Sequence, residues 1–320
     1  MLRIDYPFKK EILACGAKEC AGFCLTEKGR GYVINDLGNL DQHSAFEHYQ
    51  RQIERFRKEL KIKPKIIAHD LHPEYNSTKY AQSLSQKSKG LKCFPVQHHQ
   101  AHIASCMGEN RLKGKVIGVV FDGPGAGLDG NIWGGEFFTG GLLQGFKRIA
   151  HLKYTSITDY SSSMARLFDA VWALVGLRGK VQYEGQGVTE LEKIVNRSTH
   201  VASKIYEFAV EPDKDKFLIN PQPIFQNIVE DLEKNISKSI ISAAFHNTII
   251  EIVRQLCHKI KRKEKIKDII LTGTVFQNKV LFNRLKNLLT HDGFEVITHR
   301  HFSCNDSNIS FGQAVMADAR

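Results

Sequence analysis

Short apolar runs and longer periodic stretches alternate along the whole chain. Near the start, three short apolar runs joined by tight turns predict strands at Ile12–Ala17, Gly22–Thr26 and Gly31–Ile34. Beyond them, apolar residues recur at helical spacing in some stretches and form compact buried runs in others. The predicted helices are Ser44–Leu60, Ser77–Gln86 and His98–Met107, and the predicted buried strands are Lys65–Ala68 and Leu91–Val96.

The same order of elements begins again near residue 116. Val116–Phe121 predicts a strand that leads into a glycine-rich turn, and Ile132–Leu143 predicts a hairpin. Residues 161–260 are mostly helical in pattern, and the charged stretch Pro212–Pro223 predicts a surface loop within them. The chain ends with predicted strands at Asp268–Leu271 and Phe294–Thr298, each followed by a helix, at Phe276–Leu289 and Ile309–Asp318.

This repeated order predicts an α/β protein with two similar lobes around a cleft. We place the N-terminal α/β lobe at residues 1–113 and the C-terminal α/β lobe at residues 114–320, with a mainly helical insertion at about 160–260. Turns that follow strands converge between such lobes, so we expect a ligand to bind there.

Composition narrows the class of protein. The chain has 320 residues, of which 42% are hydrophobic and 25% charged, as in soluble globular proteins. No apolar run reaches about 18 residues, so we expect no membrane span. The N-terminus carries charges and a proline where a signal peptide needs an apolar stretch, which favours a cytoplasmic location.

The cysteines fit a reducing compartment. Their number is odd, seven, and no CxxC pair occurs, so a disulfide framework is not expected. Cys15, Cys20 and Cys24 cluster in sequence but lack the spacing of a zinc site. We interpret them as small buried residues of strands.

The formal net charge of +11 raises the question of an acidic partner such as RNA. The basic residues, however, are spread over the predicted helix surfaces, with short clusters at Arg57–Lys65 and Lys259–Lys267. Neither cluster is interleaved with aromatic residues in the way that a base-stacking platform requires. Solvated helix faces are therefore the better interpretation than a nucleic-acid site.

A histidine pair is the first candidate for chemistry. His98 and His102 are four positions apart, which places both imidazoles on one face of a helix, where they can bind one metal ion. His99 points away from that face by roughly 100°. By itself, the pattern fits core histidines with satisfied hydrogen bonds equally well.

Two glycine-rich segments are candidates for phosphate binding. Asp122–Gly127 directly follows a predicted strand, and its glycines Gly123, Gly125 and Gly127 allow the backbone to approach a phosphate closely. Gly134 and Gly135 offer a second close approach. The segment lacks the lysine of a Walker A loop, and an ordinary hairpin turn is the alternative.

Two strand-to-helix junctions complete the candidates. At Gly273 and Thr274 a strand runs into a helix whose N-terminus can bind an anion, and Asn278 lies one turn further on. Asp306, before the last helix, is either a second carboxylate ligand for a metal or an N-cap. No Gly-x-Ser-x-Gly motif and no cysteine with a partnered base occur, which disfavours a covalent hydrolase.

Taken together, these segments resemble the C-terminal domain of the HypF family of hydrogenase maturation proteins. The matching motifs appear in the family's order over nearly the whole chain: Asp70–Thr78, Val96–His102, Phe121–Gly123, Ile132–Phe137, Tyr183–Gln186, Glu190–Glu192, Val275–Asn278, Asn305–Asp306 and Ile309–Gln313. This domain is similar to the enzymes that place threonylcarbamoyl on tRNA. It shares with them the two-lobed actin/Hsp70/sugar-kinase-like (ASKHA) fold, with a nucleotide in the cleft.

The resemblance implies a carbamoyltransferase. It would move a carbamoyl group from carbamoyl-adenylate, made by a YrdC-like source, to the C-terminal cysteine of a HypE-like partner, on the route to the cyanide ligands of [NiFe]-hydrogenase. One divalent metal, iron or zinc, would be held by a set of four side chains that includes the catalytic residues: His98, His102, Asp122 and Asp306. An ATP/AMP-type nucleotide would contact the glycine-rich segments and two further motifs, through Gly123, Gly125, Gly127, Gly134, Gly135, Glu184, Gly185, Gly273, Thr274 and Asn278.

Two alternatives stay open at this point. The acceptor of the carbamoyl group is a small molecule or tRNA, or the chain is a non-catalytic protein that still binds metal or nucleotide. Pro124, Ala126 and Thr274 stand where the family usually has threonine, tyrosine and glycine, which motivates the second alternative.

Overall fold

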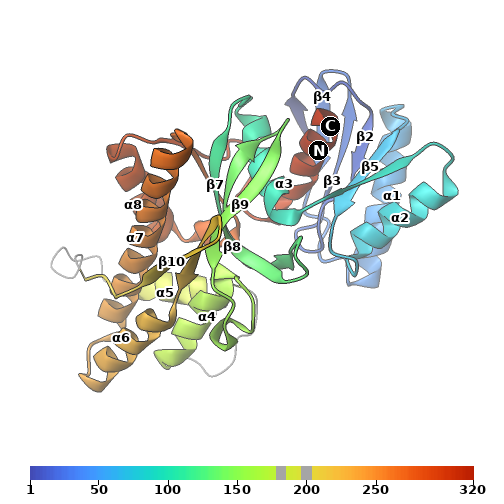
Figure 1. Cartoon of the computed structure of the whole chain (residues 1–320). Coiled ribbons are helices and arrows are strands. Elements are labelled where there is room, and N and C mark those ends of the chain that lie inside the picture. The colour runs from blue at the N-terminus through green and yellow to red at the C-terminus, as the bar shows by residue number, and fades with distance from the viewer. Residues whose placement is uncertain (178–184, 196–203) are drawn as a thin grey trace. The chain divides into compact units, whose positions relative to one another are not determined.

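A computed structural model describes residues 1–177, 185–195 and 204–320, and the chain divides into two compact units (Figure 1). Unit 1 comprises Met1–Gly114, Gly141–Phe146 and Thr298–Arg320, and unit 2 comprises Lys115–Gly140 and Lys147–Ile297. The first break lies next to the boundary expected between residues 113 and 114. The final segment Thr298–Arg320, however, belongs to unit 1, whereas the sequence assigned it to the second lobe.

Unit 1 is built on a six-stranded sheet with the order β1-β4-β3-β2-β5-β6. Its strands are β1 (Leu2–Asp5), β2 (Ile12–Ala14), β3 (Phe23–Glu27), β4 (Arg30–Ile34), β5 (Ile66–Asp70) and β6 (Lys92–Val96). The first four pair in antiparallel fashion, and β5 and β6 continue the sheet in parallel from β2. The strand β1 was not predicted from the sequence.

Helices cover both faces of this sheet. They are α1 (His43–Glu59), α2 (Asn76–Lys87), α3 (His98–Glu109) and α9 (Ile309–Ala319), the last preceded by the short η4 (Asp306–Asn308). One apolar cluster joins α3 and α9 to one face of the sheet, and a second cluster joins α1 and α2 to the other. In Figure 1, α1 and α2 accordingly lie on the opposite side of the blue strands from the red α9.

Unit 2 contains a seven-stranded sheet with the order β10-β11-β9-β8-β7-β12-β13. Its strands are β7 (Val116–Ala126), β8 (Ile132–Gly141), β9 (Gly145–Leu152), β10 (Ala209–Asp213), β11 (Lys216–Asn220), β12 (Asp268–Thr272) and β13 (Glu295–Ile297). Its described helices are η1 (Ser156–Thr158), α4 (Met164–Leu174), α5 (Gln186–Ile194), α6 (Gln222–Glu233), α7 (Lys238–Glu264), η3 (Thr274–Gln277) and α8 (Lys279–His291). The predicted helical character of residues 161–260 is thus confirmed for most of the part that is described.

The two sheets share one topology. In unit 1 the meander β2-β3-β4 is extended beside β2 by the parallel strands β5 and β6, and in unit 2 the meander β7-β8-β9 is extended beside β7 by β12 and β13. This confirms the expectation that one order of elements starts twice, near residues 12 and 116.

The segment Pro212–Pro223 is not the predicted surface loop. It contains the end of β10, the turn of the hairpin and all of β11, and Pro212 pairs with Phe217. The strand β10 is the outermost strand of its sheet, where a proline, which lacks an N–H, can be accommodated without a second strand to donate to. Proline and charge therefore indicated an edge strand rather than a loop.

The glycine-rich segments also differ from the prediction. The strand β7 continues through Ala126 with a register shift between Phe121 and Gly125, so the expected turn after Phe121 is a bulged strand. Ile132–Leu143 is not a hairpin, because β8 runs unbroken to Gly141 and pairs with β7.

Two expectations from composition are also addressed by the structure. No helix among the described residues is long and apolar enough to cross a membrane. No disulfide is formed among the described residues, and Cys15 and Cys24 are buried as expected. Cys20 is instead exposed, in a turn with φ of 46°.

Candidate metal centre

The helix α3 carries the histidine pair and is buried along nearly its whole length. It begins after Gln97, whose side chain caps the helix by accepting a hydrogen bond from the Gln100 N–H at 3.0 Å. The helix α9 approaches it very closely, because a Cβ on Gly312 would lie only 1.9 Å from the carbonyl oxygen of Ala101. This approach brings η4, at the start of α9, beside the histidines.

His98 is held by a carboxylate at the end of an interior strand of the sheet. Nδ1 of His98 lies 2.7 Å from Oδ2 of Asp70, the last residue of β5. The other oxygen of Asp70 accepts the His72 N–H at 2.9 Å. Burial alone would raise the pKa of Asp70, but the charge and hydrogen bond of His98 outweigh it and the pKa is lowered. Asp70 therefore serves as a charged acceptor that orients the imidazole.

Three of the predicted ligands lie together in unit 1. Nε2 of His98 is 3.4 Å from Oδ1 of Asp306, and Nε2 of His102 is 3.7 Å from the same oxygen. Ligand atoms in a tetrahedral site with bonds of about 2.1 Å lie roughly 3.4 Å apart. Two imidazoles and one carboxylate at these separations fit one divalent ion, and this donor set suits zinc or iron.

Asp306 was expected to be either a metal ligand or an N-cap. The cap of η4 is Asn305, whose side chain accepts from the Ser307 N–H at 3.2 Å. The carboxylate of Asp306 instead faces the two histidines. Of the two alternatives, the structure therefore disfavours the cap.

Asp122, the fourth predicted ligand, belongs to unit 2. Its Oδ1 accepts the Thr274 N–H at 3.0 Å, and its carbonyl oxygen accepts the Ser163 hydroxyl at 3.0 Å. These bonds fix both its backbone and its carboxylate within unit 2. Its role as a ligand or catalytic residue stays a prediction.

The glycine segments of unit 2 converge on the end of the buried part of β7. A Cβ on Gly273, at φ of 101°, would lie 2.3 Å from the carbonyl oxygen of Phe121. A Cβ on Gly134 would lie 2.3 Å from the carbonyl oxygen of Gly123. These positions need glycine because backbone packs against backbone. Three segments predicted to contact a nucleotide are therefore neighbours.

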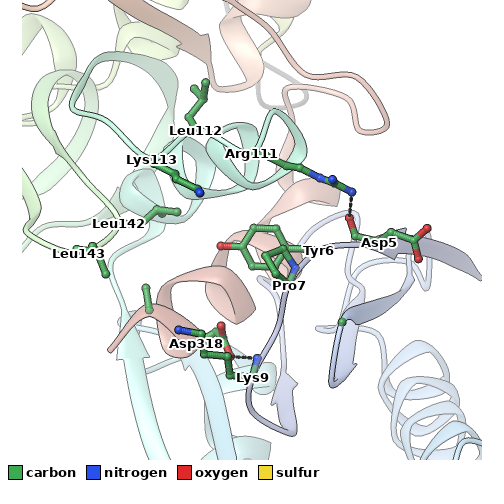
Figure 2. Close-up of a pocket in the computed structure, with 12 residues that line it drawn as sticks. Asp5, Tyr6, Pro7, Lys9, Arg111, Leu112, Lys113, Leu142, Leu143 and Asp318 are labelled. Carbon is green, nitrogen blue, oxygen red and sulfur yellow. Dashed lines mark hydrogen bonds between the residues drawn. The ribbon is translucent and has the colours of Figure 1, made fainter.

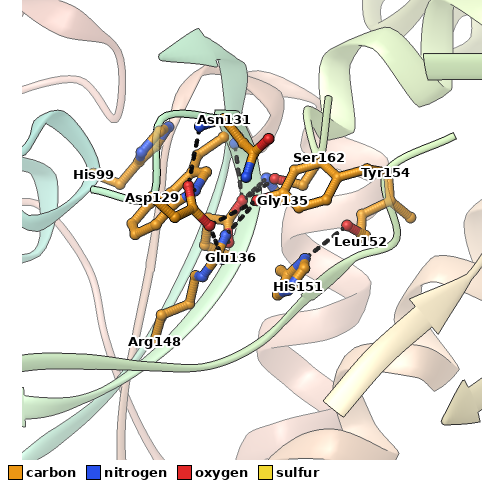
Figure 3. A network of polar contacts seen from close by, with 12 residues as sticks. His99, Asp129, Asn131, Gly135, Glu136, Arg148, His151, Leu152, Tyr154 and Ser162 are labelled. Carbon is orange, nitrogen blue, oxygen red and sulfur yellow. Dashed lines mark hydrogen bonds and ion pairs between the residues drawn. The ribbon is translucent and has the colours of Figure 1, made fainter. Parts of the chain in front are cut away.

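A buried ion network lies beside Gly134 and Gly135 (Figure 3). The amides of Gly134 and Gly135 donate to Oε1 of Glu136 at 3.1 and 3.3 Å, so these two N–H groups are used within the protein. The Arg148 guanidinium lies 3.2 Å from Oε2 of Glu136 and stacks 3.9 Å from the Trp133 ring. Burial raises the pKa of Glu136, although Arg148 acts to lower it.

Comparison with known protein families agrees with this geometry, because models of two family domains match the chain. The HypF Kae1-like domain matches residues 7–109, and the second subdomain of the Kae1-like carbamoyltransferase domain matches residues 118–159 and 156–313. Together they cover most of the chain. The chain belongs to the HypF family.

Relatives in the HypF family agree with this assignment. The probable carbamoyltransferase HypF of Methanocaldococcus jannaschii is 28% identical over 98% of this chain and 47% of its own length. The carbamoyltransferase HypF of Synechocystis is 27% identical over 98% of this chain and 48% of its own length. The chain thus spans about half the length of the curated relatives it matches.

A solved HypF structure has the same fold. A crystal structure of full-length HypF in a phosphate- and nucleotide-bound form superposes with a TM-score of 0.91 and 37% identity, over 98% of this chain and 56% of that one. A crystal structure of T. kodakarensis HypF gives a TM-score of 0.87 at 25% identity, over 99% of this chain and 48% of that one.

The remaining HypF-like motif residues differ in what surrounds them. Gly127 packs on Trp133, because a Cβ there would lie 2.2 Å from Nε1 of that ring. Asn278 is buried and caps α8, and its Nδ2 lies 2.8 Å from Nε2 of His246. Gly185 precedes α5 with φ of 76°, and Glu184 lies outside the described residues. Nucleotide contacts of these residues stay predictions.

Sequence reasoning missed several residues that contact the predicted site residues. Asp70 lies in one of the motifs that resemble the family, but no role was assigned to it. Asn308, whose Oδ1 lies 3.0 Å from Nδ1 of His102, was not identified at all. The Glu136–Arg148 pair was missed as well. The position of Asp70, a carboxylate at the end of a buried strand, was a signal that could have identified it. The roles of Asn308, Glu136 and Arg148 depend on tertiary contacts, which leave no signal in the sequence.

Unit 1 also has a hollow of about 720 Å³ (Figure 2). Its lining combines apolar side chains with charged ones, and Arg111–Lys113 come from just beyond the C-terminal end of α3. Two of its charged residues are tied to the backbone: Asp318 accepts the Lys9 N–H at 2.8 Å, and Arg111 donates to the Asp5 carbonyl at 3.0 Å. His98, by contrast, is at the N-terminal end of α3, so this hollow is not the metal centre.

Proposed function

We propose that this chain is a carbamoyltransferase domain of the HypF type. It transfers a carbamoyl group from carbamoyl-adenylate to the C-terminal cysteine of a HypE-like partner, in the cytoplasm, on the route to the cyanide ligands of [NiFe]-hydrogenase. The observation that carries the proposal is the group of His98, His102 and Asp306 at metal-ligand separations in a chain of this family.

The proposed centre holds one divalent ion, iron or zinc. His98, His102 and Asp306 are its ligands in unit 1, and Asp122 is the fourth. When bound, such an ion supplies Lewis-acid polarisation of the carbamoyl carbonyl and offsets charge on the adjoining phosphate. Asp70 keeps His98 oriented, and α9 keeps Asp306 next to α3 through the contact at Gly312.

The nucleotide of the proposed substrate lies in a cleft between two ASKHA-type lobes. The full-length HypF that resembles this chain was crystallised with phosphate and nucleotide. In this chain, the predicted nucleotide segments around Gly123, Gly134 and Gly273 are neighbours in unit 2. Since the Gly134 and Gly135 amides already donate to Glu136, we assign these two glycines to close backbone packing that shapes the site.

The attacking group in the proposed reaction comes from the partner. A thiolate sulfur attacks the carbamoyl carbon, the bond from that carbon to the phosphate oxygen breaks, and AMP leaves with the electron pair. The chain's own buried thiols are poor nucleophiles, because burial raises the pKa of Cys15 to about 12 and that of Cys106 well above its ordinary value. A YrdC-like protein or domain supplies the carbamoyl-adenylate.

A direct transfer assay tests the proposal. The metal-loaded protein is incubated with carbamoyl-adenylate and a HypE-like protein, and the intact mass of the partner is followed. We expect the partner to gain one carbamoyl group, and to gain none when its terminal cysteine is replaced by serine or when the enzyme carries H98A. Well-folded, metal-loaded protein that leaves the partner unmodified contradicts the proposal, and carbamoyl appearing on tRNA or a small molecule instead identifies another acceptor.

A further inference from the structure

His102 is held differently from His98. A carboxylate faces Nδ1 of His98, whereas Oδ1 of the Asn308 amide lies 3.0 Å from Nδ1 of His102. A carboxylate can only accept, but an amide can present either an acceptor or a donor. The orientation of Asn308 therefore decides which nitrogen of His102 carries the proton.

The other end of the amide settles its orientation. Nδ2 of Asn308 donates to the carbonyl oxygen of Ser303 at 2.9 Å. A carbonyl oxygen accepts and never donates, so the NH₂ group must face Ser303 and the amide oxygen must face His102. Nδ1 of His102 then donates to Asn308. The lone pair of the neutral ring lies on Nε2, which faces Asp306.

The segment that contains Ser303 is fastened to the same helix as His102. Glu109 is the last residue of α3, and its Oε2 accepts the backbone N–H groups of Arg300 and His301 at 2.7 and 2.5 Å. Its Oε1 lies 2.5 Å from Nδ1 of His299. Residues 299–301 are thus clamped to the C-terminal end of α3, and Ser303, two residues further on, presents its carbonyl oxygen to Asn308.

We propose that Asn308 is a positioning residue that fixes His102 in the Nδ1–H tautomer, with Nε2 directed at the metal, and that the clamp from Glu109 to residues 299–301 supports the segment to which Asn308 donates. This inference rests on the metal centre of the proposed function and deepens it. Loss of such a partner of a metal-bound histidine typically weakens metal affinity about 10- to 100-fold.

The test compares the affinity of three variants for Co²⁺ and Zn²⁺, measured against a chelator of known strength. N308L removes the acceptor for His102, and we expect affinity to fall about 10- to 100-fold. N308D keeps an acceptor there and is expected to bind more tightly than N308L. N110A is the matched control: Asn110 also ties α3 to this segment, through the Thr298 carbonyl at 3.1 Å, but does not contact His102, so N110A should bind like the wild type.

A spectroscopic measurement on the wild-type protein tests the tautomer of His102 directly, without any substitution. Long-range ¹H–¹⁵N spectra of the metal-free protein should show His102 protonated on Nδ1. Protonation on Nε2 overturns the inference, as do equal losses of affinity in N308L and N110A, or wild-type affinity in N308L.

The failure of the proposed function is distinguishable from these outcomes. A wild-type protein that binds neither Co²⁺ nor Zn²⁺ refutes the metal centre, whereas one that binds them without transferring carbamoyl refutes the reaction and leaves the affinity series intact.

Discussion

Gly312 lies where α9 crosses α3, and its replacement by alanine tests how the metal centre is assembled. An added Cβ would lie 1.9 Å from the Ala101 carbonyl oxygen, whereas ordinary van der Waals contact begins at 3.4 Å. The helices must therefore separate locally by about 1.5 Å (3.4 − 1.9) to admit one methyl group. Both atoms in conflict follow the backbone, so no side-chain rotation relieves the clash.

The expected cost follows from two opposing effects. Overpacking in a dense interior destabilises by about 1–3 kcal/mol. Alanine regains about 0.5–1 kcal/mol over glycine within a helix. Because the clash involves backbone, the upper part of the overpacking range, about 2–3 kcal/mol, applies. We therefore expect G312A to lose about 1–2.5 kcal/mol of unfolding free energy, measured from urea transitions followed by circular dichroism. Metal–ligand distances tolerate changes of only about 0.2 Å, so Co²⁺ affinity should fall as well.

Two other glycines of unit 1 provide graded controls. A Cβ on Gly108 would lie 2.9 Å from side-chain atoms of Phe311 and Val315, which can rotate away, and a Cβ on Gly114 would meet nothing within 4 Å. The expected order of destabilisation is G312A, then G108A, then G114A with little change. Wild-type stability and metal affinity in G312A would refute the argument that this helix contact places Asp306.

Three further predictions concern single side chains. H98A should lose bound metal after gel filtration, measured by elemental analysis, and full retention would exclude His98 as a ligand. D292N should be less stable than wild type at pH 7, because the hydrogen bond from Arg254 lowers the pKa of Asp292. This stabilising contribution is complete above about pH 4 and shrinks as the pH falls. The urea midpoints of the two proteins should therefore converge in acid. E136A should lower the free energy of unfolding in urea by about 3 kcal/mol. The substitution leaves the buried Arg148 guanidinium without this carboxylate and removes the acceptor of two glycine amides. A loss below about 1 kcal/mol would refute the stabilising role of this network.

Much of the fold could be predicted because burial sets the pattern of apolar residues. Strands buried on both faces, such as β5 and β12, read as continuous apolar runs, and α1 shows one apolar stripe. The predictions of secondary structure failed where the conformation that a residue tolerates depends on its position in a sheet. Pro212 begins the predicted surface loop but is tolerated in the edge strand β10, and the glycines after Phe121 continue a bulged strand.

The candidate site was predictable only in its local part. The pair His98 and His102 follows from helical spacing, and Asp306 was named as a ligand or a cap. The atoms that orient these histidines are 28 and 206 positions away in sequence, at Asp70 and Asn308, and no local pattern links them. Helix packing at Gly312 brings Asn308 close to His102, and a single glycine in a helical stretch carries little signal of this contact.

The division of residues between the units has a consequence for the proposed reaction. His98, His102, Asp306 and the groups that orient them all belong to unit 1, whereas Asp122 and the described glycine segments belong mainly to unit 2. A change confined to unit 1, such as G312A, should therefore weaken metal binding more than nucleotide binding. A change in the Glu136 network should do the reverse. Under the proposed function, transfer needs both, so each kind of variant should lose activity while keeping one of the two ligands.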